Sequence, residues 1–144
     1  MRYVYLSGRC SIFILFFWSP VTVAIMVSLN QFREIALSLP EVIERPHFEK
    51  TSFRVNKKIF VTLSEKDHIA CVTLTEIDQD VFSTFDRSII YPVPNKWGKQ
   101  GWTFIALNKI EKELLVDAVI TAYCKVAPKR LVAAVSRNDV DGII

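Results

Sequence analysis

The sequence has few of the residues that build catalytic and metal sites. Its four glycines form no glycine-rich phosphate-binding loop. The three cysteines, Cys10, Cys71 and Cys124, lie far apart without a CxxC pair, which argues against a disulfide framework and a zinc site. The two histidines, His47 and His68, have no companion at metal-ligand spacing, and no nucleophile is recognisably paired with them. The sequence therefore predicts a non-enzymatic protein with no metal and no other cofactor.

The composition is that of a folded chain with only a mild excess of positive charge. Hydrophobic residues make up 51% of the 144 residues and charged residues 23%, which excludes a disordered or low-complexity protein. A chain of this length hides about two-thirds of its unfolded surface, which is enough for one domain with a real core. The formal net charge of +3 permits DNA or RNA as a partner without requiring one.

Charged residues are missing from a long stretch near the N-terminus. None occurs between Ser11 and Gln31, and residues 12–18 are continuously apolar after Arg2 and Arg9. Such a pattern is typical of a membrane span or of a signal-peptide core that follows a basic region. A real anchor at residues 11–29 would make the protein membrane-anchored.

A second interpretation starts from the residues that follow Met26. Ser28 and Gln31 have the spacing of a capping box, so a folded domain begins within two residues of an internal methionine. On this hypothesis Met26 is the biological start and residues 1–25 are translated upstream sequence. Both interpretations stay open. Either one divides the chain into an apolar segment at 1–25, a domain at 26–131 and a tail at 132–144.

Beyond Met26 the hydrophobic pattern alternates between helical and strand periods. The cap at Ser28 opens a helix with Leu29, Phe32, Ile35, Ala36 and Leu39 on one face. Residues 41–49 form a polar connection and 92–101 an irregular loop. We expect the following elements in order: a helix ended by Pro40, strands at 51–55, 58–63 and 68–74, a helix of about ten residues capped by Thr75, strands at 88–91 and 102–107, and a helix opened by Asn108 and Glu111 that ends near Val126.

Hairpin connections between the strands determine the expected fold class. Asn56 and Lys57 form a two-residue turn between the first two strands. The middle helix carries Ile77, Val81 and Phe85 at i, i+4 and i+8, a helical apolar row. The order is α-β-β-β-α-β-β-α, so the fold class is α+β: an antiparallel meander with helices packed largely on one face.

Two basic segments are candidates for binding phosphates. Arg54, Lys57 and Lys58 cluster at the predicted hairpin turn, where they would contact a nucleic-acid backbone without reading its sequence. The alternative is a solvated turn whose lysines guard a sheet edge. The cations Lys125, Lys129 and Arg130 near the end of the last helix are explained by its dipole.

The loop at 92–101 is the second segment, and it combines aromatic, basic and glycine residues. Lys96, Trp97 and Lys99 suit stacking on bases and contact with phosphates. An alternative function is a small-ligand site that binds an aromatic compound, lined by Asn95, Trp97, Gly98, Gln100 and Trp102. A purely structural role is also open, with Trp102 in the core and Trp97 holding the loop against the body.

Several segments together resemble the MmcQ/YjbR family. They are Phe32-Arg33 with Ala36 to Pro40, Pro46-His47-Phe48, Ser52 to Val55, Lys58 to Leu63, Pro92 to Asn95, Trp97-Gly98, Gln100 to Thr103, and Ala127 to Leu131. The resemblance implies a CyaY-like (frataxin-like) α+β fold, a cytoplasmic location and DNA as the partner. The loop from Asn95 to Trp102 departs from the asparagine-lysine-lysine-x-tryptophan pattern of other members.

Overall fold

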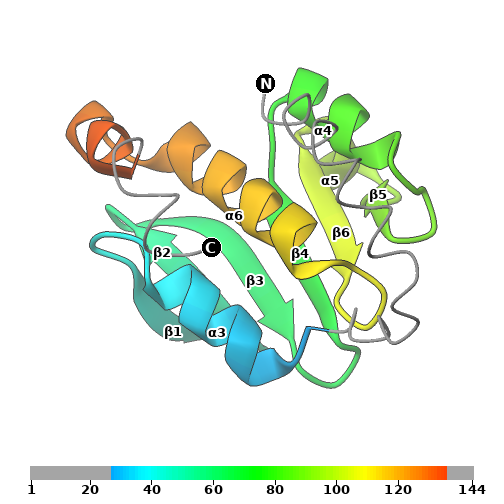
Figure 1. Ribbon diagram of the computed structural model, residues 1–144, viewed down its shortest axis with the longest axis horizontal. Coiled ribbons are helices and arrows are strands. Elements are labelled where there is room, and N and C mark those ends of the chain that lie inside the picture. Colours follow the sequence, from blue (N-terminus) through cyan, green and yellow to red (C-terminus); the bar gives the residue numbers. More distant parts are fainter. Residues whose placement is uncertain (1–26, 136–144) are drawn as a thin grey trace, which may run out of the picture.

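The computed structural model describes residues 27–135, in which helices pack against one face of an antiparallel sheet (Figure 1). The elements in chain order are α3 (Leu29–Leu37), β1 (Ile43–His47), β2 (Lys50–Val55), β3 (Lys58–Ser64), β4 (Ile69–Thr73), α4 (Glu76–Ser83), β5 (Ile90–Pro92), α5 (Lys96–Lys99), β6 (Trp102–Ala106) and α6 (Lys112–Val126). Residues 129–135 are also helical. The predicted α+β class is confirmed, and the comparison with the CyaY-like fold stays a prediction.

The six strands of the described residues lie in the order β1-β2-β3-β4-β6-β5, and every neighbouring pair is antiparallel. The predicted turn between β2 and β3 is confirmed. Asn56 and Lys57 have φ values of 51° and 69°, as the type I′ turn of a tight hairpin requires. This geometry matches the right-handed twist of the two strands, so their register is well specified.

Both outer strands of the sheet contain a proline. β1 includes Pro46 and β5 ends at Pro92, and within residues 27–135 each of these strands pairs with only one neighbour. The prediction that residues 41–49 form a connection is wrong, because β1 pairs with β2 from Ile43 to His47. Most of its side chains are exposed, so the segment shows no apolar alternation, and an edge strand tolerates the missing N–H of proline.

The core lies between the sheet and the helices α3 and α6. Phe32 of α3 packs edge-on against Phe53 of β2, with ring centroids 5.6 Å apart. Phe60 of β3 meets Tyr123 of α6 in the same way at 5.5 Å. The register shifts between Phe53 and Arg54, and this irregularity lets the consecutive residues Phe60 and Val61 both be buried.

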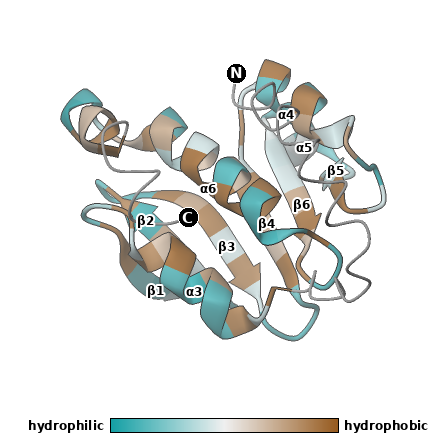
Figure 2. Cartoon of the chain, in the orientation of Figure 1, coloured by the Kyte–Doolittle hydropathy of each residue, from teal (hydrophilic) through white to brown (hydrophobic). Residues whose placement is uncertain are grey.

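The helix termini confirm the predicted caps at Ser28 and Thr75 and correct the one predicted at Asn108. At α3 the capping box of Ser28 and Gln31 is present in both directions, and Phe32 is buried. Figure 2 shows hydrophobic and hydrophilic bands alternating along α3 and α6. The prediction that Asn108 opens the last helix is wrong: α6 starts at Lys112 with Glu111 as a cap that makes no side-chain hydrogen bond. The predicted end at Val126 is confirmed.

Helix α4 forms where it was expected, but its apolar row faces outward. Ile77, Val81 and Phe85 are 75%, 40% and 49% exposed. The buried residues of the helix include Gln79 and Phe82 instead. The physical reason is that the amide of Gln79 must face inward, where it donates to buried oxygen atoms near α5 and β6.

The expectations for residues 1–25, and for an anchor starting at residue 11, fall mainly outside the described residues. Within residues 27–135 no helix combines the length and the apolar character that crossing a membrane requires.

Candidate nucleic-acid interface

The β2–β3 turn presents a cluster of cationic side chains. Lys57 and Lys58 are exposed. Arg54 is partly exposed and lies two residues before Asn56 of the turn. Nε of Arg54 donates to Oγ of Ser52 at 3.0 Å, and Ser52 in turn donates to the backbone oxygen of Arg45 at 3.0 Å. The guanidinium of Arg54 is therefore held against the sheet, whereas the two lysines extend into solvent.

The segment expected to be an irregular loop contains a short helix, α5, with Asn95 as its N-cap and Gln100 as its C-cap. Oδ1 of Asn95 accepts from the backbone N–H of Trp97 at 2.7 Å, which fixes the start of α5. Trp97 is 49% exposed, and Nζ of Lys96 lies 5.9 Å from the centroid of its indole. One indole is thus presented to solvent beside two exposed lysines, Lys96 and Lys99.

The glycines of this segment have a structural role. A Cβ at Gly98 would overlap the backbone oxygen of Val93, and a Cβ at Gly101 would overlap that of Leu74. Gly101 also has a φ of 97°, a conformation that favours glycine. Nε2 of the buried Gln79 donates to the backbone oxygen of Gly98 at 3.0 Å, so α4 fixes the position of α5.

The alternative ligand-binding residues are divided between structural and exposed positions. Asn95 caps α5, Gly98 is buried against a neighbouring backbone, and Trp102 is partly buried at the start of β6. Gln100 is exposed and Trp97 half-exposed. The depression described below is lined by none of these five residues, so a pocket at this loop stays a prediction.

The strand register brings the two basic segments to the same end of the sheet. β3 starts at the β2–β3 turn and runs antiparallel to β4, which therefore ends on that side. β6 starts opposite the end of β4, with Trp102 paired to Thr73, and α5 directly precedes it. In Figure 1 the turn and α5 lie on the two sides of the C-terminal half of α6. Within residues 27–135, Arg54, Lys57, Lys58, Lys96 and Lys99 form no ion pair.

The cations near the end of α6 are engaged in the fold. Nζ of Lys125 donates to the backbone oxygen of Leu74 at 2.7 Å and to Oγ1 of Thr73 at 2.9 Å. Partial burial lowers the pKa of Lys125, an effect that the nearby Asp78 opposes. Arg130 makes a bidentate pair with Glu41 at 2.7 and 3.2 Å. These two cations therefore hold α6 and the following helix in place.

The sheet face that points away from the helices was not identified from the sequence. Among residues 27–135 no helix covers this face, which we call the uncovered face. One row of cross-strand partners crosses its six described strands: Arg45, Ser52, Thr62, Cys71, Phe104 and Tyr91. The neighbouring positions, such as Phe53 and Thr103, face the helices, because they contact Phe32 and Gln79. No signal in the sequence marks β1 as the outer strand of this face, because its side chains are mostly exposed.

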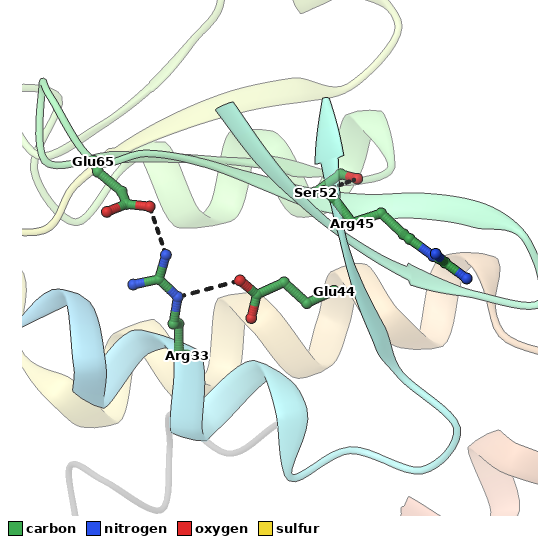
Figure 3. A network of polar contacts seen from close by, with 5 residues as sticks. All are labelled: Arg33, Glu44, Arg45, Ser52 and Glu65. Carbon is green, nitrogen blue, oxygen red and sulfur yellow. Dashed lines mark hydrogen bonds and ion pairs between the residues drawn. The ribbon is translucent and has the colours of Figure 1, made fainter. Parts of the chain in front are cut away.

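The charged side chains of the strands are divided unevenly between the two faces. In the six described strands Glu44 is the one acidic residue, and it faces α3, where it pairs with Arg33 at 3.4 Å. Arg33 also pairs with Glu65, whereas Arg45 points away from this network (Figure 3). By strand alternation Arg45, Lys50 and Arg54 all point to the uncovered face. The strands thus give this face cations and no carboxylates.

A shallow depression of about 310 Å³, part of it open to solvent, lies on the uncovered face. Lys50, Thr62, Cys71 and Phe104 are among its lining residues, together with Asp67, which accepts a hydrogen bond from Ser64 at 2.7 Å. Burial raises the pKa of the Cys71 thiol to about 11, which the nearby Lys50 opposes. The thiol is therefore protonated at neutral pH and is not an activated nucleophile.

The acidic residues at the start of α4 serve the helix itself. Oδ2 of Asp78 accepts from Oγ1 of its cap residue, Thr75, at 2.7 Å, and Glu76 lies in the same first turn. Across residues 27–135, no three metal-ligating side chains come together in an arrangement that would hold a metal ion.

Comparisons with known proteins agree with this architecture. The crystal structure of the Deinococcus radiodurans protein DR2400, a DUF419 domain, superposes with a TM-score of 0.63. The similarity covers 80% of this chain and 89% of that chain at 17% identity, which shows a shared fold. No curated protein matches the sequence. The YjbR family model matches residues 37–125, most of the folded part. Because this match spans more than half of the chain, the protein belongs to the YjbR family.

Proposed function

We propose that this protein is a non-enzymatic DNA-binding protein. The observation that carries the proposal is that the β2–β3 turn and α5 lie at one end of the sheet, where the cations of both segments have no acidic partner in residues 27–135. In this proposal Arg54, Lys57 and Lys58 contact phosphates from one side, and Lys96 and Lys99 contact them from the other. Such contacts bind the backbone of any DNA sequence.

Trp97 has a different role in this proposal, because its side chain is uncharged. Its half-exposed indole lies next to the lysines of α5, where it stacks on an accessible base or wedges between two bases. Stacking does not release counterions. Replacing Trp97 should therefore weaken binding without changing the salt dependence.

The test is fluorescence anisotropy of the full chain with labelled duplex DNA at several salt concentrations. Each phosphate contact contributes about 0.9 to the slope of log affinity against log salt. The double variant Lys57→Ala/Lys58→Ala should therefore lower that slope by up to about 1.8 for all sequences tested. The matched control is Lys109→Ala/Lys112→Ala, because it removes the same charge from exposed residues at the start of α6.

Two results would contradict the proposal. A folded wild-type chain that does not bind duplex or single-stranded DNA at low salt would exclude DNA as the partner. A slope that changes equally in the Lys57/Lys58 variant and in the control would show that net charge, and not the turn, is responsible for binding.

A further inference from the structure

The uncovered face of the sheet has cations on one side and aromatic rings on the other. The proposed function uses Arg54 of this face but none of its other side chains. The row of cross-strand partners on this face begins with the cationic Arg45 on β1 and continues through Ser52 and Thr62, two hydroxyl residues that are buried beneath their neighbours. The row ends with two aromatic residues, Phe104 on β6 and Tyr91 on β5. Their ring centroids lie 5.7 Å apart in an edge-to-face arrangement, and both side chains are partly exposed.

The dimensions of this row fit an extended polymer. Six strands at a spacing of about 4.8 Å give a track of about 24 Å across the sheet. Lys50 reaches into the middle of the track, because it lines the same depression as Cys71 and Phe104 on strands that are two and three places away. A cation and an aromatic ring are therefore neighbours within one concave site.

Charge complementarity indicates an anionic occupant. Arg45, Lys50 and Arg54 point to this face, and the one strand carboxylate, Glu44, points to the other. Asp67 also lines the depression and brings one carboxylate, which accepts a hydrogen bond from Ser64, so the three cations outnumber it. Partly exposed aromatic rings beside cations stack on the faces of unpaired bases. In a duplex these faces are covered by the neighbouring base pairs.

We infer that the uncovered face binds single-stranded nucleic acid, with bases stacked on Phe104 and Tyr91 and phosphates at Lys50, Arg45 and Arg54. This inference rests on the proposed function, since Arg54 belongs to both surfaces. It predicts that the protein prefers single-stranded to double-stranded nucleic acid, a preference that contacts at the β2–β3 turn and α5 alone would not produce. The occupant is a chain of linked nucleotides, because the cations and the aromatic rings lie on different strands of the track.

The test compares a labelled single strand of about 12 nucleotides with a duplex of the same sequence, using the full chain and anisotropy. Phe104→Leu removes the ring but keeps an apolar side chain, and it should weaken single-strand binding about 5- to 100-fold. Duplex binding should change little. The matched control is Phe85→Leu, which removes a half-exposed ring just after the end of α4.

A second variant protects the test against a folding defect. Lys50→Ala changes an exposed residue, and it should lower the salt slope of single-strand binding by about 0.7, with Lys112→Ala as the control. Unchanged single-strand affinity in both variants would overturn the inference, as would equal losses for duplex and single strand. A free mononucleotide that binds as tightly as the strand would also overturn it.

The outcomes separate the two proposals. If the wild-type chain binds neither form of DNA at low salt, the proposed function itself fails. If binding depends on Lys57 and Lys58 but not on Phe104 and Lys50, the proposed function stands and the sheet face is not the site.

Discussion

Replacing Gln79 by methionine tests whether one buried amide holds α5 in place. The side chain is 7% exposed, and its Nε2 donates to the backbone oxygens of Gly98 and Trp102 and to Oγ1 of Thr103, at 3.0, 3.2 and 3.0 Å. Methionine has nearly the same length and no donor. The substitution therefore removes the hydrogen bonds and leaves no large cavity.

The loss of stability depends on which hydrogen bonds the three acceptor oxygens retain in the variant. The oxygen of Gly98 still accepts from the N–H of Gly101, and the oxygen of Trp102 still accepts from that of Val93, both at 3.0 Å. Because neither carbonyl loses its last partner, the full penalty for an unsatisfied buried group does not apply. The loss of two amide donors should lower the free energy of unfolding by about 1–2 kcal/mol.

A carboxylate at the same position gives a sharper comparison. Gln79→Glu has the same shape, but it places oxygen atoms against two carbonyl oxygens and buries a charge. We expect a loss of about 3 kcal/mol or more for this variant. Gln100→Met is the control, since Gln100 is exposed, and it should change stability by less than about 0.5 kcal/mol.

Urea unfolding followed by circular dichroism measures all three variants of the full chain. The expected order of stability is Gln100→Met, then Gln79→Met, then Gln79→Glu. If Gln79→Met unfolds within about 0.5 kcal/mol of the wild type, or if Gln79→Glu is no worse than Gln79→Met, the amide does not hold α5 as described.

Two further predictions concern groups whose pKa is raised by burial. The buried Tyr123 donates its hydroxyl to the backbone oxygen of Pro40 at 2.8 Å, and its pKa is raised from 10.0 to about 12. Between these values the folded protein keeps a proton that the unfolded chain loses, so stability should fall as the pH rises from 10 to 12. Tyr123→Phe should cost about 1 kcal/mol at pH 7 and make that alkaline loss shallower, measured by urea unfolding at each pH, and an unchanged alkaline slope would refute the assignment. Because the pKa of Cys71 is about 11, iodoacetamide at pH 8 should alkylate it much more slowly in the folded protein than in urea, as peptide mass spectrometry would show, and equal rates would contradict its burial.

Local signals in the sequence were sufficient for the elements that have strong turn or cap chemistry. The capping box of Ser28 and Gln31 and the turn at Asn56 and Lys57 use side-chain and backbone geometry within four residues, so they were predictable. β1 was missed because an exposed edge strand has no buried alternation to reveal it. Its recognition requires knowing that β2 offers an unpaired edge, which is a property of the whole sheet.

The candidate site was only partly predictable for a similar reason. The basic turn and the basic segment around Trp97 were found from composition, because their lysines are close together in the sequence, although the helix α5 itself was not predicted. Lys50, Phe104 and Tyr91 come together only through strand pairing, with Phe104 far along the chain from Lys50. Helical periodicity also could not predict which side of α4 is exposed, because the contacts of Gln79 with α5 and β6 set the orientation of the helix.

The prolines in the two outer strands also affect how copies of this protein meet one another. An open strand edge exposes unpaired N–H and C=O groups, which can recruit a strand from another chain and start a fibril. Pro46 removes one donor from β1, and β5 offers only three residues before it ends at Pro92. Neither border of the sheet is a good template for adding a foreign strand. We therefore expect concentrated or newly made copies of the chain to resist aggregation that begins at the sheet edges.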